Sequence, residues 1–168
     1  KMLEELKDYK EMASAYNNIG YILKSQEQYD RALEYYEEAI RLLEKTDNKK
    51  WLPFFLDNIG ELYYLKGQYT KALPYHERSL ALREITKSKA GLDASYSYFG
   101  VTYHKLGQAE KALEYFIKAL KIREEAGNKH GIANSANNIG ALYLEKKNYK
   151  EAEKYLKKIT NNTNKLKD

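Results

Sequence analysis

The sequence predicts an all-α fold, an α-solenoid of stacked antiparallel helix pairs. The first observation is a four-residue phrase that recurs every 40 residues; it reads NNIG, DNIG, SYFG and NNIG and ends at Gly20, Gly60, Gly100 and Gly140. The second is that each block holds two stretches with apolar residues at i, i+3, i+4 and i+7, the spacing that lines one face of an α-helix. Repeated pairs of amphipathic helices are typical of a solenoid, in which each repeat packs on its neighbours.

The composition is that of a folded chain without disulfides. The 168 residues are 43% hydrophobic and 32% charged, with a net charge of +5 and no cysteine, so no disulfide or thiolate metal site can form. No run approaches the roughly 18 apolar residues of a membrane helix, and residues 1–10 are mixed in charge, unlike a signal peptide. Lysines and glutamates are interspersed along the chain, which favours a solvated helical surface over a face that binds nucleic acid.

The first helix of each block contains the glycine phrase. Its apolar face is formed by Tyr16, Ile19, Gly20 and Leu23, and then by Leu56, Ile59, Gly60 and Tyr63, by Tyr96, Phe99, Gly100 and Tyr103, and by Ala136, Ile139, Gly140 and Tyr143. A glycine inside a helix costs about 0.5–1 kcal/mol relative to alanine. Its recurrence therefore predicts that a neighbouring helix approaches closely at this point.

The second helix of each block carries its own apolar stripe, which in the first block runs from Tyr29 to Leu43. Its centre reads ALEYY, ALPYH, ALEYF and AEKYL, beginning at Ala32, Ala72, Ala112 and Ala152. We expect these small alanines to face the glycines of the first helix, so that the two helix axes can come close together.

Polar residues at the same period predict the helix boundaries. The expected caps of the first helices are Asp8, Asn48, Ser88 and Asn128. Between the two helices of a block, Gly67 and Gly107 occupy a turn position that favours a left-handed backbone, whereas Glu27 and Lys147 occupy it at a cost of roughly 1 kcal/mol. The turns at Glu27 and Lys147 are therefore expected to be less regular.

The blocks share one order of residues: a large residue, then Leu or Ile before Gly, then Tyr, and later Ala followed by an aromatic residue. This order resembles the tetratricopeptide repeat. The resemblance covers nearly the whole chain and implies a right-handed superhelix. The period is 40 residues, and Glu44, Glu84 and Glu124 stand where a proline usually ends the second helix. This longer form is similar to the repeats of kinesin light chains, LGN-type adaptors and bacterial signalling proteins.

We expect one array over residues 1–168. Residues 1–8 align with the end of a second helix and are interpreted as the end of a truncated preceding repeat, followed by four repeats at 9–48, 49–88, 89–128 and 129–160 and a tail at 161–168. Because the tail lacks a polar-faced capping helix, the chain resembles a piece of a larger scaffold or signalling protein.

The resemblance implies that the first helices line a concave groove that binds a ligand. The groove positions are Asn17, Asn18, Tyr21 and Lys24; Asp57, Asn58, Glu61 and Tyr64; Ser97, Tyr98, Val101 and His104; Asn137, Asn138, Ala141 and Leu144. Asparagine is a middling helix former, so its place inside three of these helices needs a reason. Its amide could pair with the backbone of an extended peptide, or it could brace neighbouring helices, and the sequence leaves both interpretations open.

The second repeat is irregular, since it holds Trp51, Pro53 and Pro74, the chain's only tryptophan and both of its prolines. Pro53 predicts either that the first helix starts near residue 52 or that it kinks, and Pro74 poses the same choice for the second helix. Phe54 falls at a groove position, where with Tyr64 and Tyr98 it could form an apolar pocket for a ligand side chain; the alternative is that Phe54 belongs to the core.

Catalytic interpretations find little support. His76 replaces an aromatic core residue, His104 falls in the groove without a second histidine or a suitably spaced carboxylate, and His130 lies near the Asn128 cap. The glycines lie inside helices, where they cannot form a phosphate-binding loop. We therefore predict no enzyme activity, no cofactor and no metal.

The predicted function is a protein-binding module that holds a protein or an extended peptide in the groove. We expect no nucleic-acid or membrane partner and a cytoplasmic location, and the oligomeric state is left open. A regulatory or sensory array fused to a histidine kinase or transcription regulator is the alternative. An RNA-binding helical repeat is less favoured, because it would need a period nearer 35 residues and a basic groove.

Overall fold

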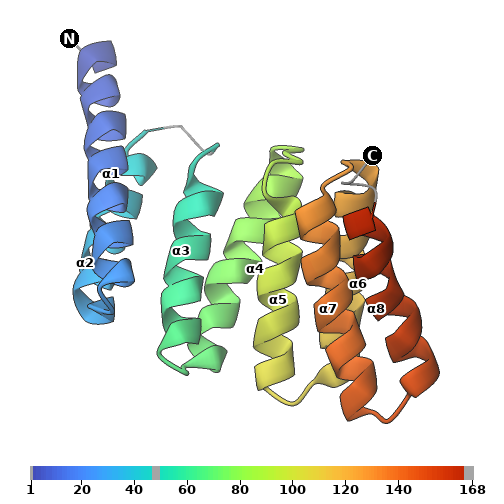
Figure 1. Ribbon diagram of the computed structural model, residues 1–168. Coiled ribbons are helices and arrows are strands. Elements are labelled where there is room, and N and C mark those ends of the chain that lie inside the picture. The colour runs from blue at the N-terminus through green and yellow to red at the C-terminus, as the bar shows by residue number, and fades with distance from the viewer. Residues whose placement is uncertain (1, 47–49, 165–168) are drawn as a thin grey trace. The chain divides into compact units, whose positions relative to one another are not determined.

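The computed structural model describes the backbone of residues 2–46 and 50–164 and the side chains of residues 8–46 and 50–159. These residues form eight α-helices and no strand (Figure 1). The helices are α1 (Met2–Ser25), α2 (Tyr29–Glu44), α3 (Leu52–Leu65), α4 (Tyr69–Ile85), α5 (Leu92–Lys105), α6 (Ala109–Glu125), α7 (Lys129–Glu145) and α8 (Tyr149–Asn164).

The helices pair in chain order, α1 with α2, α3 with α4, α5 with α6 and α7 with α8, and the partners are antiparallel (Figure 1). They belong to two compact units, Lys1–Gly91 with α1 to α4 and Leu92–Asp168 with α5 to α8. Within a unit the second helix of one pair packs on the first helix of the next, α2 on α3 and α6 on α7. The expected all-α class, built from stacked antiparallel helix pairs, is confirmed.

Each unit has its own core, formed by the apolar stripes of its helices. In the first unit Leu43, Leu56 and Ile59 are buried together, and in the second unit Phe116 and Ile139 are buried in the corresponding cluster. Burial of such a side chain stabilises the fold by about 1.5–3 kcal/mol, so the helix pairs depend on packing more than on helix propensity.

A large side chain of the second helix lies over each recurring glycine, and the expected alanine side chain does not. A Cβ atom on Gly60 would lie 2.3 Å from the ring of His76, and one on Gly100 would lie 2.4 Å from Phe116. Tyr36 and Leu156 cover the other two glycines in the same way. The alanines lie four residues earlier on the second helix and are fully buried, so the glycine accommodates a large side chain one helical turn further on.

Of the expected caps, one is confirmed. The Asn128 side chain accepts a hydrogen bond from the Gly131 N–H at 2.9 Å and caps α7. Asp8 lies inside α1, and Ser88 precedes α5 by a loop that continues through Gly91 at a φ of 74°, so these two predictions are wrong. Asn48 lies outside the described residues.

The turns within the pairs share one geometry. Gly67 and Gly107 adopt a φ of 71° and 73°, and Glu27 and Lys147 adopt 59° and 56°. After Gly67 the Gln68 N–H donates to the Tyr63 carbonyl, and after Glu27 the Gln28 N–H makes the equivalent bond to Leu23, a Schellman motif in both cases. The prediction of less regular turns is wrong, because the two backbone hydrogen bonds form whether or not the left-handed residue is a glycine.

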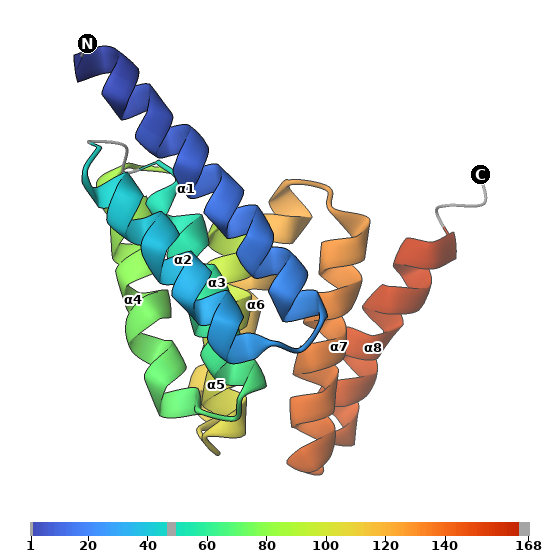
Figure 2. The same ribbon diagram turned by 90° about the vertical axis from the view of Figure 1, so that its left-hand side faces the viewer.

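Helix ends also revise the expected repeat boundaries. Residues 2–8 belong to α1 and do not end a separate helix, and the N-terminal turns of α1 extend past α2 (Figure 2). Residues 161–164 continue α8, so the helix reaches into the expected tail. The α3 helix begins at Leu52 with Pro53 in its first turn, which confirms the later start, whereas α4 contains Pro74 in its interior. No helix in the described part of the chain is both long and apolar enough to cross a membrane.

Candidate functional site

Groove residues of α1 and α3 are joined by side-chain contacts. The Asn58 amide nitrogen donates to the Asn17 side-chain oxygen at 2.8 Å, and Lys24 Nζ lies 2.7 Å from Glu61 Oε2. Both contacts link the first helix of one pair to the first helix of the next. Asn17, Lys24, Asn58 and Glu61 therefore brace the first unit on the surface that the resemblance assigns to a ligand.

The asparagine contact leaves hydrogen-bonding capacity on that surface. An amide has two donor hydrogens and an oxygen with two lone pairs. The bond between the two side chains uses one hydrogen of Asn58 and the oxygen of Asn17, so it does not use the Asn17 nitrogen or the Asn58 oxygen. The next residue along α1, Asn18, is exposed. Bracing and ligand contact are thus compatible at this pair.

Asp57 is not on the groove surface, contrary to the prediction. Its carboxylate is only 6% exposed, and Oδ2 lies 2.9 Å from Nη1 of Arg83 on α4. The other oxygen lies 3.6 Å from Nδ1 of His76, which is also buried. A buried carboxylate needs such a partner, since an unpaired charge in the interior is strongly destabilising.

Phe54 and Tyr64, the two residues of the expected aromatic pocket that belong to the first unit, contact different residues. Phe54 packs on the core of the first unit, with the Arg83 guanidinium 4.8 Å from its ring centroid and Trp51 at 5.8 Å. Tyr64 is ten residues further along α3, which is roughly 15 Å away along the helix axis, and its ring contacts Tyr69. Phe54 therefore fits the core interpretation, and it shares no pocket with Tyr64. The third residue, Tyr98, lies on α5 in the other unit.

Tyr21 is the most exposed aromatic residue predicted for the groove. Its side chain is 60% exposed, and Lys24 Nζ lies 5.2 Å from the ring centroid. A cation over a tyrosine ring gives the pair about 0.5–1 kcal/mol at an exposed site. The same lysine also pairs with Glu61, so Tyr21 lies at the edge of the bridge between α1 and α3.

In the second unit, the first helices α5 and α7 are also linked. His104 Nε2 lies 2.9 Å from Glu145 Oε2, which places one predicted groove residue in a bridge between the two helices. Asn137 is exposed and Asn138 is half-buried on α7. Val101 packs against the core of this unit, and Ser97 donates to the Asp93 carbonyl of its own helix at 3.0 Å, so neither projects a free polar group.

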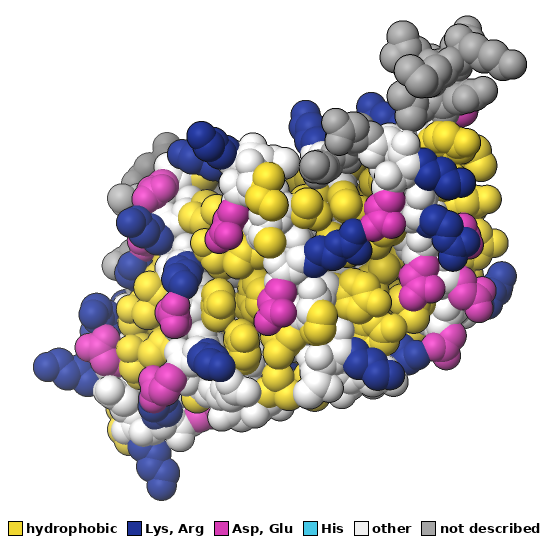
Figure 3. All heavy atoms as spheres, turned by 180° about the vertical axis from the view of Figure 1, so that it is seen from behind, with side chains coloured by type: hydrophobic (Ala, Val, Ile, Leu, Met, Phe, Trp, Pro, Cys, Tyr) yellow, Lys and Arg dark blue, Asp and Glu magenta, His cyan; other side chains and the backbone are white. Residues whose placement is uncertain are grey.

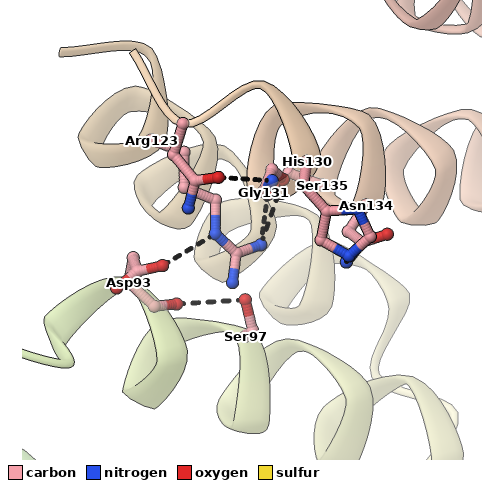
Figure 4. Close-up of polar contacts among 8 residues, drawn as sticks. Asp93, Ser97, Arg123, His130, Gly131, Asn134 and Ser135 are labelled. Atoms are coloured by element: carbon pink, nitrogen blue, oxygen red, sulfur yellow. Dashed lines mark hydrogen bonds and ion pairs between the residues drawn. The ribbon is translucent and has the colours of Figure 1, made fainter. Parts of the chain in front are cut away.

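Two arginines that sequence reasoning missed, Arg83 and Arg123, link neighbouring helices through their guanidinium groups. Arg123 of α6 donates from Nε to Asp93 Oδ2 of α5 at 2.8 Å and from Nη1 to Ser135 Oγ of α7 at 2.8 Å (Figure 4). It also donates to the Gly131 carbonyl, and a Cβ on Gly131 would lie 2.7 Å from the arginine Cδ. Arg83 is the equivalent residue 40 positions earlier, with Gly91 as its glycine.

Tyrosine stacks lie between first and second helices at equivalent positions. The ring centroids are 5.4 Å apart in the pair Tyr63–Tyr75 and 5.8 Å apart in the pair Tyr143–Tyr155, and both pairs are half-buried. Lys71 and Lys154 lie over the outer faces of these rings. Figure 3 shows one face of the molecule, on which hydrophobic side chains are interspersed with charged ones. The stacks contribute to packing within each pair, and their lysines cover part of the apolar area.

Each of the three histidines contacts a different side chain. His76 is fully buried over Gly60, His104 pairs with Glu145, and His130 lies 3.3 Å from the Asn134 side chain. Among the described residues, no three His, Asp or Glu side chains gather closely enough to hold a metal ion.

Known structures share this fold. BtubC (BKLC) from P. vanneervenii aligns over 92% of this chain and 64% of its own length, with a TM-score of 0.84 and 17% identity. The apo form of RapI aligns over 95% of this chain and 58% of its own length, with a TM-score of 0.85 and 18% identity. A structure described as kinesin-light-chain TPR-like repeats from Podosopora anserina aligns over 92% of this chain and 76% of its own, with a TM-score of 0.71 and 18% identity.

This chain therefore spans less than two thirds of the length of BtubC and RapI. At these identities the likeness shows the fold alone. No curated protein matches the sequence. The family profile described as Tetratricopeptide repeat matches residues 11–85 and 92–165, which together cover most of the sequence. The chain belongs to the tetratricopeptide repeat family.

Proposed function

We propose that the chain is a non-catalytic interaction module, whose first helices bind an extended segment of a protein partner. The tetratricopeptide repeat fold is typically a protein-interaction fold, and concave surfaces of stacked helix pairs serve binding in solenoids generally. In the first unit the binding surface would lie on α1 and α3, and in the second unit on α5 and α7.

The observation that carries this proposal is the hydrogen bond between Asn17 and Asn58. A mid-helix asparagine needs a reason, and the bond to the next first helix supplies part of it. The same bond fixes the orientation of both amides. It leaves a donor on Asn17 and an acceptor on Asn58, the two groups that an extended backbone needs in order to pair with a side chain. Because the amides are held in place, less side-chain entropy is lost when a ligand binds.

The test begins with selection from a displayed library of random 12-residue peptides against the whole chain. The selected peptides are then titrated against Asn17→Ala, Asn58→Ala and Asn138→Ala. Each lost hydrogen bond has a net worth of about 0.5–1.5 kcal/mol, so we expect affinity to fall roughly three- to tenfold at the sites that a peptide contacts. Thr70→Ala, an exposed polar residue on the second helix α4, is the matched control and should leave affinity unchanged.

Thermal melts of the same variants separate binding from bracing. Alanine is the better helix former, so the melting temperature should change little. A lowered melting temperature with unchanged affinity would instead make the asparagines braces, and the binding surface would have to be sought on the second helices. Failure to select any peptide would contradict the proposed function itself.

A regulatory role is the second candidate, because the 40-residue repeat resembles the repeats of bacterial signalling proteins. The two candidates differ in what surrounds the array in the full-length protein. A scaffold role requires only that the partner binds the isolated chain. A regulatory role also requires that the bound partner changes the activity of another domain, which is measured on the full-length protein with and without the selected peptide.

A further inference from the structure

A hollow of about 230 Å³ lies beside the asparagine pair, between α1, the end of α2 and the start of α3. Its apolar side is formed by Leu43, Trp51 and Phe55. Leu43 and Phe55 are core residues, so they give the hollow a fixed floor. Trp51 is different, since 41% of this large side chain is exposed at the mouth of the hollow.

The opposite side of the hollow is polar and comes from one face of α1. It is formed by Lys10, Ser14, Asn17 and Asn18, and none of the lining residues that the structure describes is acidic. A second lysine lies at the tryptophan, with Lys50 Nζ 5.6 Å from a Trp51 ring centroid. The hollow thus combines an apolar side, the Asn17 amide of the proposed backbone contact and Lys10, with Lys50 close to Trp51.

The size of the hollow limits what it can hold. Sites for small molecules usually have volumes of about 300–1,000 Å³, so a hollow of this size fits a single large side chain better than a whole cofactor. A partly exposed tryptophan next to a well-packed floor has the character of an interface anchor, and such anchors carry most of the energy in protein interfaces. The lysines favour a partner with negative charge close to the anchored side chain.

We propose that the hollow seats one large apolar side chain of the bound segment, and that the segment carries an aspartate or glutamate within about two residues of it, directed at Lys10 and Lys50. The inference rests on the proposed function and deepens it by stating the chemistry of the partner. The occupant is a stretch of polypeptide in which Phe, Leu, Met or Trp is flanked by a carboxylate.

Trp51 makes the site directly observable, because it is the only tryptophan of the chain. Peptides selected from the same 12-residue library that contain no tryptophan are titrated while the fluorescence of Trp51 is recorded. Burial of the indole should shift its emission to shorter wavelength, with a midpoint equal to that of peptide binding measured by anisotropy of a labelled peptide.

Variants of Trp51 then test the apolar side of the hollow. Trp51→Ala should weaken binding by about 30-fold, the effect typical of an interface anchor, and Trp51→Phe should restore most of it. The matched control is Tyr149→Ala, which removes an aromatic residue that is 67% exposed on α8 and should leave affinity unchanged. Melting curves check that Trp51→Ala remains folded.

Charge reversal at the mouth tests the carboxylate. With Lys10→Glu, affinity for peptides selected on the wild type should fall about fivefold, and a fresh selection should exchange Asp and Glu beside the apolar residue for Lys and Arg. The proposed seat is overturned if selected peptides bind and follow the asparagine variants while Trp51 emission and the Trp51→Ala affinity stay unchanged. That result would leave the proposed function standing, whereas an empty selection would remove both.

Discussion

Nη1 of Arg83 lies 2.9 Å from Oδ2 of Asp57, and the two side chains are 1% and 6% exposed. The guanidinium also donates to the Ser79 hydroxyl, which itself donates to the Pro53 carbonyl at 2.9 Å. From its Nε the arginine donates to the Ala90 carbonyl at 3.0 Å. The interior of the second repeat thus contains an ion pair whose charges are held by hydrogen bonds to α3, α4 and the loop that follows.

Asp57→Ala should be among the most destabilising single changes, because it leaves the Arg83 charge buried without its carboxylate. Loss of one partner of a buried pair costs about 3–5 kcal/mol, measured as the free energy of unfolding in urea. Asp30→Ala is the control, since Asp30 pairs with Lys66 while its side chain is 84% exposed, and it should cost less than about 1 kcal/mol. Equal effects of the two changes would contradict the importance of burial.

Tyr36 should make stability fall in alkaline solution. Burial, and then the nearby Glu61 and Tyr21, raise the pKa of its phenol above the ordinary value of 10.0. Its contribution is fully present below pH 10, and it is lost as the pH rises further, because the unfolded chain releases the proton first. Tyr36→Phe should therefore make the decline above pH 10 shallower, measured as the free energy of unfolding in urea at a series of pH values.

Gly100→Ala should destabilise the second unit by about 1–3 kcal/mol through overpacking. The new Cβ would lie 2.4 Å from the ring of Phe116, so that ring must move out of its place in the core. The double variant Gly100→Ala with Phe116→Leu should recover part of the loss, measured by chemical unfolding. Strict additivity of the two changes would mean that they do not meet.

Lys147→Gly should stabilise the turn between α7 and α8 by up to about 1 kcal/mol, because the residue has a φ of 56° and a glycine there carries no Cβ strain. The reverse change, Gly67→Ala, should lower stability by a similar amount, since Gly67 has a φ of 71° and open space around its Cα. Thermal melts of both variants check this pair of opposite effects. A lower melting temperature for Lys147→Gly would contradict it.

Much of the fold could be predicted from periodicity. The 40-residue spacing identified the helix pairs, and Gly67, Gly107 and Asn128 were assigned their correct roles because each depends on local backbone chemistry. Asp8 and Ser88 failed as caps because a helix start also depends on what precedes it, a continuing helix in one case and a longer loop in the other.

The candidate site was less predictable, because the position of a residue on its own helix does not determine which side chains of other helices lie beside it. Asp57 falls in the register of groove residues, yet it turns inward because Arg83 and His76, both distant in sequence, supply its partners. The role of Arg83 and Arg123 could have been inferred from their 40-residue spacing and from the glycine that follows each of them eight residues later. Trp51 drew notice only for its rarity, and the hollow beside it depends on Leu43 and the α1 face together.

Arg123 also has a mechanical consequence. Its guanidinium holds Asp93 on α5 with Nε and Ser135 on α7 with Nη1, so a single side chain spans two first helices from the helix between them. A force that draws α5 away from α7 loads both hydrogen bonds at the same moment, in addition to the apolar contacts of the core. The second unit should therefore resist stretching up to one threshold and then yield in a single step, in contrast to helices that peel off one after another.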